Sequence, residues 1–551
     1  MAVNEADRLF EGAISDILEK TWQRYPDLAS GLGLHQFDGR IPDISKTSLA
    51  ERTRELQIGI ASLENIDNTA LSHKNYYDYE ILLTALRKEL FELTELKLQE
   101  TNPMEMLWHI EVSHYVQREY APLEERVTAL VSALRAVPKY LGQLQELMAH
   151  SPGKAVIEAS IEAYTGVKTF YQNDLVEAVT DLENQELYAR FISARDGAST
   201  SITKFIGFLN SMLEHAPEKF AIGSERFTKL LNYGEMVDLP LERLLEIGVA
   251  DLGGNLARFQ QLAAKVSPNK SPAEVMSEIA SDHPAADQLI PYTRDMLEEI
   301  RQYLIDKDIV TIPSDIRCIT TETPSFMRWA FAALDFPGPY EEKATQTYYY
   351  VTPVEDDWSD EEKEQWLTSF NYATLRAVSV HEAYPGHYVH YLHTKNTKSK
   401  IGTIFGAYSF WEGWAHYTEQ MMIEEGYGSD DPRNVLGQLM EALLRDCRFI
   451  CAIRMHTQGM SLDEATQFFM ENAYMEELPA QKEAARGTFD PMYLNYTLGK
   501  LMILKLREDY RAEKGDRFSL KQFHDTFLSF GAPPIPLVRE MMLRDAGEEA
   551  L

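Results

Sequence analysis

Apolar residues recur at helical spacing along most of this chain, and that periodicity constrains the fold more than any other feature. Segments rich in Leu, Ala, Glu, Lys and Gln follow this spacing, and such composition favours α-helix. The predicted helices cover about residues 5–25, 47–100, 122–150, 154–180, 187–217, 240–265 and 284–305, and resume from about 359 to the C-terminus. The sequence therefore predicts a mainly α fold, large enough for two lobes.

Two short segments depart from the helical pattern. Residues 309–324 and 344–354 are rich in β-branched and aromatic residues and contain prolines near their ends, which is typical of short strands. We expect them to form one small β-sheet beside the helices that carry the chemistry, with an edge strand that could pair with an extended peptide. A soft boundary at about residue 310 divides the chain into an N-terminal helical scaffold lobe, 1–310, and a catalytic lobe, 311–551, within one continuous structural unit.

Composition excludes several classes of partner. The chain has 551 residues, of which 44% are apolar, and a formal net charge of −33 at pH 7. The apolar content is sufficient for a large core, and the negative field repels nucleic acids and anionic membrane surfaces, so neither is expected as a partner. The acidity serves solubility, or it also attracts cations such as a metal ion or the amino groups of peptides.

The sequence also bears on location. It contains no run of about 18 apolar residues, so no membrane span is predicted. The N-terminal residues lack the basic and apolar regions of a signal peptide, which predicts a cytoplasmic location. Only Cys318, Cys447 and Cys451 occur, so there is no disulfide framework, as suits a reducing compartment.

A helix predicted to start at Ser359 leads into the sequence HEAYPGH. Ser359 and Glu362 form the pattern of a capping box, and an apolar stripe follows it as far as His381 and Glu382. A His-Glu pair that ends a core helix begins the motif HExxH, in which two histidines on one helix face bind zinc and the glutamate activates water. The segment is therefore a candidate metal site.

The spacing within this segment differs from HExxH. The second histidine, His387, follows His381 by six residues, which is about 240° around a regular helix, so an unbroken helix could not bring both rings to one ion. Pro385 interrupts the helical hydrogen bonds, and Gly386 permits backbone angles that other residues avoid. We predict a bulge or loop over residues 384–386 that brings His387 beside His381.

A zinc ion needs a third protein ligand, and the next predicted helix, about residues 403–425, offers one. It contains SFWEGWAHYTEQ, in which Glu412, His416 and Glu419 fall on one helix face. Carboxylates in so aromatic a segment are costly to bury unless they are paired or bound to a metal. We predict Glu412 as the third ligand, with surface acids on a half-buried helix as the alternative. Other divalent ions also suit a His/His/Glu site.

Together these motifs resemble a known family. HEAYPGH followed by SFWEGWA, with TYYYVTP before them and YTLGKL near the C-terminus, is similar to the bacterial family named domain of unknown function 885, over most of the chain. The resemblance implies a helical zinc metallopeptidase, distantly similar to peptidases with HExxH and a downstream Glu, such as angiotensin-converting enzyme. It implies His381, His387 and Glu412 as metal ligands and Glu382 as the general base.

At one position the chain departs from the compared peptidases. They hold an acid four residues after the ligand Glu, where it orients a zinc-bound histidine, and here that position is His416. Glu419 or another acid is then expected to take this part. The tetrahedral oxyanion of peptide hydrolysis also needs a hydrogen-bond donor. Tyr493 and Tyr496 are the candidates, with Tyr496 preferred from the family pattern and a packed core tyrosine as the alternative.

Three further residues are candidates for contact with substrate. His456 and Arg454 could contact the substrate or the transition state, with structural roles as the alternative. Arg486 could hold a substrate carboxylate, or it could simply pair with Glu483.

We therefore expect one catalytic zinc ion and the hydrolysis of peptide bonds, with a peptide or another small amide as the substrate. Two alternatives stay open: a zinc hydrolase of a non-peptide amide or ester, and a non-catalytic helical binding protein that keeps the metal cage as a structural element. Glu382 argues against the last, because a purely structural site has no use for an unligated acid beside its first ligand. Substrate identity, internal or terminal cleavage, and oligomeric state are not predicted.

Overall fold

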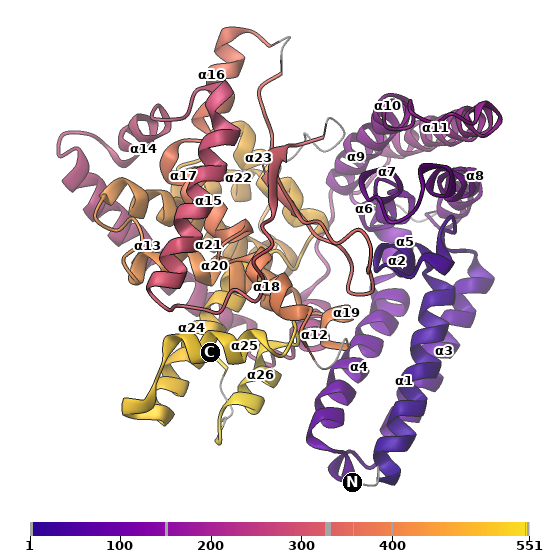
Figure 1. Ribbon diagram of the computed structural model, residues 1–551, viewed down its shortest axis with the longest axis horizontal. Helices are drawn as coiled ribbons and strands as arrows, with labels where there is room; N and C mark the ends of the chain where they lie inside the picture. The colour runs from indigo at the N-terminus through magenta and orange to yellow at the C-terminus, as the bar shows by residue number, and fades with distance from the viewer. Residues whose placement is uncertain are drawn as a thin grey trace. The chain divides into compact units, whose positions relative to one another are not determined.

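The computed structural model describes residues 4–148, 152–324, 332–355, 358–397, 401–545, 547 and 550–551. By its contacts the chain divides into two units, Met1–Ile222 with Pro337–Thr345, and Gly223–Phe336 with Gln346–Leu551. Both units are built mainly from helices (Figure 1), which confirms the predicted mainly α fold. No helix of the described residues has the length and apolar content that a membrane crossing requires.

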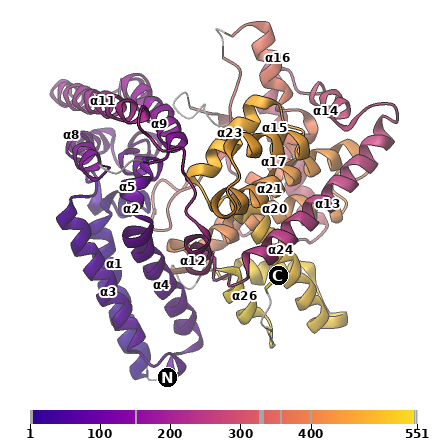
Figure 2. The same ribbon diagram turned by 180° about the vertical axis from the view of Figure 1, so that it is seen from behind.

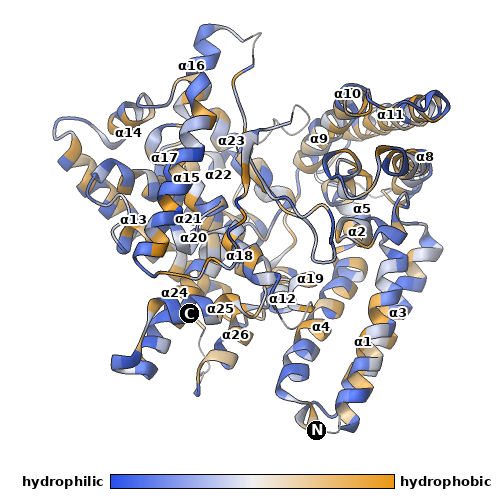
Figure 3. Ribbon diagram, in the orientation of Figure 1, coloured by the Kyte–Doolittle hydropathy of each residue, from blue (hydrophilic) through white to orange (hydrophobic). Residues whose placement is uncertain are grey.

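Eleven helices make up the described part of the first unit. Their bounds are α1 (Glu5–Arg24), α2 (Pro26–Gly31), α3 (Lys46–Glu64), α4 (His73–Phe91), α5 (Leu98–Thr101), α6 (Pro103–Leu107), α7 (His114–Gln117), α8 (Leu123–Leu147), α9 (Lys154–Gln172), α10 (Asp174–Ala178) and α11 (Gln185–Leu213). Helices α1, α3 and α4 lie side by side (Figures 1 and 2), and polar and apolar residues alternate along them (Figure 3), as amphipathic helices require. Phe10, Leu56 and Leu82 are among the buried side chains of these three helices.

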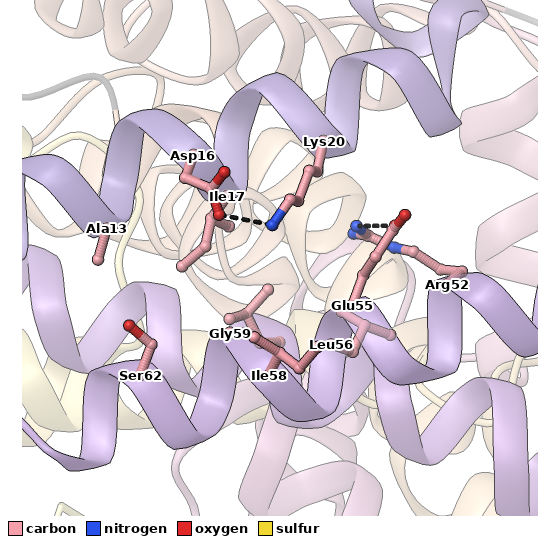
Figure 4. A pocket seen from close by; sticks show the side chains of 11 residues that line it. Ala13, Asp16, Ile17, Lys20, Arg52, Glu55, Leu56, Ile58, Gly59 and Ser62 are labelled. Carbon is pink, nitrogen blue, oxygen red and sulfur yellow. Dashed lines mark hydrogen bonds and ion pairs between the residues drawn. The ribbon is translucent and has the colours of Figure 1, made fainter.

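A small cavity of about 60 Å³ lies among α1, α3 and α4 (Figure 4). Two of its charged side chains pair with each other, with 2.6 Å between Lys20 Nζ and Asp16 Oδ2. Arg52 and Glu55 lie 3.6 Å apart at its other end. Because these charges are already paired, the cavity is a packing gap between amphipathic helices and offers little to a ligand.

The second unit contains the remaining helices. Their bounds are α12 (Ser224–Glu235), α13 (Leu241–Val266), α14 (Pro272–Ala280), α15 (Leu289–Asp306), α16 (Asp360–Thr368), α17 (Tyr372–Glu382), α18 (His387–Thr394), α19 (Ile401–Ile404), α20 (Tyr408–Glu424), α21 (Pro432–Thr457), α22 (Leu462–Asn472), α23 (Glu477–Phe489), α24 (Asn495–Lys514), α25 (Leu520–Leu528) and α26 (Ile535–Met542). Figures 1 and 2 show α17, α20 and α21 next to one another within this unit.

The second unit also holds a three-stranded sheet, in the order β1-β3-β2. β1 (Ile319–Glu322) runs parallel to β3 (Tyr348–Val351), and both lie within the two segments predicted as strands. β2 (Ala332–Asp335) pairs antiparallel with β3. Sequence analysis did not predict β2, because its residues AALD include none of the β-branched or aromatic types that mark the other two strands.

Contacts divide the chain at residue 222, whereas the sequence changes character near residue 310. Helices α12 to α15 therefore belong with the second unit. Helix α13 packs along α21, where Gly248 lies against the ring of Phe449, and Lys500 of α24 pairs with Asp251 of α13 at 2.6 Å. The change in composition near residue 310 marks where strands begin, whereas the contacts show that the helices between residues 223 and 310 pack in the second unit.

The loop between β2 and β3 belongs to the first unit. Residues 337–345 make their contacts there, although both flanking strands lie in the second unit. Tyr340 N donates to Leu32 O at 2.9 Å, and His35 Nε2 lies 2.8 Å from Glu341 Oε2. The connection between the two strands is thus a structural part of the N-terminal helices.

Two close helix crossings position the helices of the candidate site. At Gly413 and Gly499, a Cβ atom on either residue would overlap the backbone of the other helix, so α20 and α24 meet backbone to backbone. Helices α17 and α21 also meet closely, because a Cβ atom on Gly437 would overlap the backbone of Ala373. Such crossings require glycine, and they bring side chains one turn away close together.

Candidate metal centre

The helix predicted to run from Ser359 into the motif is two helices, so that prediction was wrong. Ser359 and Glu362 form the predicted capping box at the start of α16. A second N-cap follows, because Asn371 Oδ1 accepts a hydrogen bond from Thr374 N at 2.9 Å and starts α17. Asparagine favours N-cap positions because its side chain satisfies a free backbone N–H, so this break is encoded locally.

The helix breaks again inside the motif, as predicted. Helix α17 ends at Glu382 and α18 begins at His387, and residues 383–386 between them leave the helical path. The break brings the two histidines together: the ring centroids of His381 and His387 lie 4.8 Å apart with planes at 89°.

Gly386 is required at this break. Its N–H donates to Val380 O at 3.0 Å, which folds the chain back on the end of α17. A Cβ atom at residue 386 would overlap the carbonyl oxygen of His381, so only glycine fits. Trp414 of α20 holds the break from the other side, because its Nε1 donates to Pro385 O at 3.0 Å.

Three side chains then present ligand atoms to one another. In His381, His387 and Glu412 these atoms all lie within 4.8 Å. Glu412 Oε2 is 3.4 Å from Nε2 of each histidine, and this buried oxygen forms no hydrogen bond with the described residues. Charge-assisted hydrogen bonds are shorter, about 2.7–2.9 Å. Two ligands on a tetrahedral zinc ion, with bonds of about 2.0–2.1 Å, are instead about 3.3 Å apart, so donor types and spacing fit zinc.

The carboxylate of Glu412 and the rings of His381 and His387 also interact electrostatically. Burial disfavours the charged form of His381, but the neighbouring carboxylates of Glu412 and Glu419 outweigh it and raise the pKa of His381 to about 9. Burial also opposes ionisation of Glu412, and the neighbouring His387 and His381 nevertheless hold the pKa of that carboxyl well below its usual range. A divalent cation would replace the histidine proton, so binding of a metal is expected to release protons.

Glu419 orients the first histidine. Its side chain is fully buried, and its Oε1 lies 2.7 Å from His381 Nδ1, which can therefore donate while Nε2 stays free for a metal. Its Oε2 lies 3.1 Å from His416 Nδ1. Burial lowers the pKa of His416 to about 3, so this histidine stays neutral. The structure thus brings Glu419, and not His416, into contact with a ligand residue.

Two arginines that sequence analysis missed, Arg445 and Arg448, contact the residues around the candidate ligands. Arg445 Nη2 is 3.3 Å from Glu419 Oε1, and Arg448 makes two bonds of 2.7 Å to Glu483. Their guanidinium carbons lie 5.5 and 5.1 Å from the ring centroid of Tyr496. The sequence LLRDCRFI contained a signal for them, because charged residues within an apolar helix are buried only when paired.

Tyr496 lies beside the three candidate ligand residues, and the described residues show no contact between Tyr493 and them. The ring of Tyr496 stacks 6.3 Å from that of His381, and the side chain is half-buried. Burial and the charge of Glu412 raise the pKa of Tyr496, so its hydroxyl is a neutral donor. Tyr493 is fully buried, and its hydroxyl is 3.9 Å from Met455 Sδ, as a packed core tyrosine would be.

His456 and Arg454 make contacts elsewhere. His456 is buried, with its Nε2 2.7 Å from Gly487 O, and Arg454 lies 5.5 Å from the ring centroid of Phe468. These positions agree with the structural alternatives for both.

Arg486 is linked to the candidate site by a hydrogen bond to Tyr408. It pairs with Asp490 and not with Glu483, with Nε and Nη2 at 3.2 and 3.0 Å from Asp490 Oδ2. Its Nη2 also donates to Tyr408 Oη at 3.0 Å. The Tyr408 ring lies edge-on to the Tyr496 ring, with centroids 5.8 Å apart. Tyr408 is a third residue, after Arg445 and Arg448, whose position at the site sequence analysis did not predict.

Glu382 follows the first ligand directly and is not a member of the ligand group. Its side chain is half-buried at the end of α17. The described residues give its carboxylate neither a hydrogen-bond donor nor a cation.

Comparisons with known proteins bear on the family and the fold of this chain. A family model described as "Bacterial protein of unknown function (DUF885)" matches residues 26–542, which confirms the predicted family. The fold is similar to that of a protein of unknown function from Shewanella oneidensis, provisionally described as a lipoprotein, at 25% identity and a TM-score of 0.82, over 97% of this chain and 100% of that chain. A second provisional lipoprotein, from Colwellia psychrerythraea, is 15% identical with a TM-score of 0.82 and covers 98% of each chain. No curated protein matches the chain.

Proposed function

The chain belongs to the DUF885 family of bacterial proteins of unknown function, and we propose that it is a zinc-dependent hydrolase of peptide bonds. One observation carries the proposal: with the helix broken at residues 383–386, Glu412 Oε2 lies 3.4 Å from Nε2 of both His381 and His387, close to the separation of two ligands on a tetrahedral zinc ion. The proposed ligands are these three residues. When bound, zinc supplies a Lewis acid, which polarises a carbonyl group and lowers the pKa of water.

The chain's own residues supply the proton transfers. Glu382 accepts the proton of the attacking water as the water oxygen bonds to the carbonyl carbon. The same carboxyl then gives the proton to the amide nitrogen as the C–N bond breaks, which releases a carboxylic acid and an amine. Tyr496 donates a hydrogen bond to the oxyanion that forms between these steps and keeps its own proton.

The unligated Glu382 supports an enzyme over a structural metal site. A structural site closes all four positions with protein ligands, whereas three protein ligands leave one position for water or substrate. Here the ligand group has three members, with a half-buried carboxylate beside it.

Cytoplasmic location stays a prediction from the sequence, which cell fractionation would test.

Metal content and a peptide digest test the proposal. The purified protein is expected to hold about one zinc per chain and to cleave members of a peptide library. Glu382→Gln should keep the zinc and lose cleavage, and Glu361→Gln, an exposed acid on α16, should change neither. Cleavage of esters or small amides but of no peptide would favour the non-peptide alternative. Zinc without any Glu382-dependent cleavage would favour a binding protein.

A further inference from the structure

Tyr408 stands one helical turn before Glu412. It is the first residue of α20, and residues four apart lie on the same face of a helix. Its side chain is half-buried, as is that of Tyr496, so a bound substrate can reach both. The two rings meet edge to face at 5.8 Å, and the Tyr496 ring in turn stacks on the ring of His381. Two phenols therefore lie next to each other at the proposed zinc site.

Arg486 fixes how these phenols are oriented. Two of its nitrogens are held by Asp490 Oδ2, which sets the plane of the guanidinium group. Its Nη2 donates to Tyr408 Oη at 3.0 Å, and its Cζ lies 5.9 Å from the ring centroid of Tyr496. Since Asp490 follows directly after the helix that carries Arg486, this arrangement is built from one short segment of chain.

The hydrogen bond from Arg486 decides the chemistry of Tyr408. A phenol has one proton to donate, and its oxygen is the only atom that can accept. Here the oxygen already accepts from a cation, so the hydroxyl proton is available for a different partner. The described residues contain no acceptor for that proton within hydrogen-bond distance. Accepting from a cation also polarises the O–H bond, which makes the phenol a stronger donor.

On the basis of the proposed peptidase function, we propose that Tyr408 is a second donor to the oxyanion and that Arg486 is its positioning residue. When water adds to the carbonyl carbon, the negative charge on the carbonyl oxygen is shared between hydrogen bonds from Tyr408 and Tyr496. Both tyrosines keep their protons, and Glu382 alone transfers one. This assigns Arg486 to orientation and not to binding of a substrate carboxylate.

The test compares Tyr408→Phe with the wild type on the best peptide from the library. Removal of one oxyanion donor lowers kcat by roughly 10²-fold, while KM, zinc content and Tm are expected to stay as in the wild type. A phosphinic peptide, whose tetrahedral phosphorus carries the oxyanion, should lose affinity by a similar factor in a calorimetric titration. Tyr188→Phe, a half-buried tyrosine of α11, is the matched control and should change none of these values.

A double-mutant cycle tests the positioning role. Arg486→Met should lower kcat less in the Tyr408→Phe background than in the wild type, because its effect passes partly through Tyr408. Wild-type kcat and phosphinic-peptide affinity in Tyr408→Phe would overturn the proposal, as would a loss of zinc or Tm that accounts for the whole effect. If Arg486→Met instead raises KM only for peptides with a free C-terminus, and not for amidated ones, Arg486 binds a substrate carboxylate and the proposal is wrong.

Failure of the proposed function would look different. In that case the wild type would cleave no peptide, and Glu382→Gln would match it. Phosphinic-peptide binding then still tests the donor pair, because binding of a tetrahedral oxyanion does not depend on turnover.

Discussion

Replacing Glu419 with glutamine should weaken both zinc binding and the stability of the fold, by free energies of similar size. Glu419 is fully buried and lies 2.7 Å from His381 Nδ1 and 3.3 Å from Arg445 Nη2. Glutamine preserves the shape and can still accept from His381, but its neutral oxygen is a poorer acceptor and no longer enhances the basicity of the ring. Loss of such an outer partner costs about 10–100-fold in metal affinity, which is about 1.4–2.7 kcal/mol.

The apoprotein should also lose stability through Arg445. This buried guanidinium has two carboxylate neighbours, Glu419 and Glu441, and the substitution removes one of the two charges. A hydrogen bond to a charged group contributes about 1.5–3 kcal/mol, so the free energy of unfolding should fall by an amount in that range. Glu441→Gln is the matched control, because it removes the other carboxylate of the same arginine without a contact to His381.

Competition with a chromophoric chelator gives the zinc Kd of each protein, and urea denaturation in excess EDTA gives the stability of each apoprotein. We expect Glu419→Gln to weaken both and Glu441→Gln to weaken stability alone. Equal zinc affinities in the two variants would refute the claim that Glu419 acts through the His381 ring.

Other predictions follow from single contacts. Gly386→Ala must displace the carbonyl of His381, so it should abolish stoichiometric zinc uptake and lower the free energy of unfolding by about 1–3 kcal/mol; zinc retention in mass spectrometry would contradict this. Gly499→Ala places a Cβ atom against α20 and should lower the free energy of unfolding, measured in urea, by a similar amount. Because α20 carries the proposed ligand Glu412, KM or kcat should also change. Burial and the nearby Asp251 raise the pKa of Asp446, so the folded protein keeps a proton there that the unfolded chain releases. Asp446 therefore contributes its full stabilisation below about pH 4, and this contribution is lost as the pH rises through the raised pKa. In Asp446→Asn, the free energy of unfolding should depend less on pH over that range. Removal of zinc with a chelator should lower Tm, and restoring zinc should recover it, as binding to the folded state alone requires.

Local patterns predicted much of the candidate site. Pro385 removes a helical hydrogen bond and Gly386 permits backbone angles that other residues avoid, so the break that brings His387 to His381 could be inferred from the chain alone. The capping box at Ser359 was also correct. Asn371 was overlooked because the apolar stripe runs through it without a change of phase, although asparagine is a common N-cap.

Contacts between distant helices could not be read from local patterns. Arg445 and Arg448 lie on α21, far along the chain from the ligands, and they reach the site only because α17 and α21 cross at Gly437. Tyr408 was visible as one aromatic residue among several, and its role depends on an arginine 78 residues away. The strand β2 lacked the residue types by which strands are recognised.

The loop between β2 and β3 affects how the protein can be divided experimentally. The chain passes from one unit to the other three times, after residues 222, 336 and 345, so no single cut produces two intact fragments. A C-terminal fragment starting at residue 223 would expose Tyr340, whose ring packs edge-on against Trp22 in the full chain. Residues 337–345 pack in the first unit, although the strands that they connect belong to the second. Truncations, fusions and domain exchanges should therefore keep the N-terminal helices together with this loop.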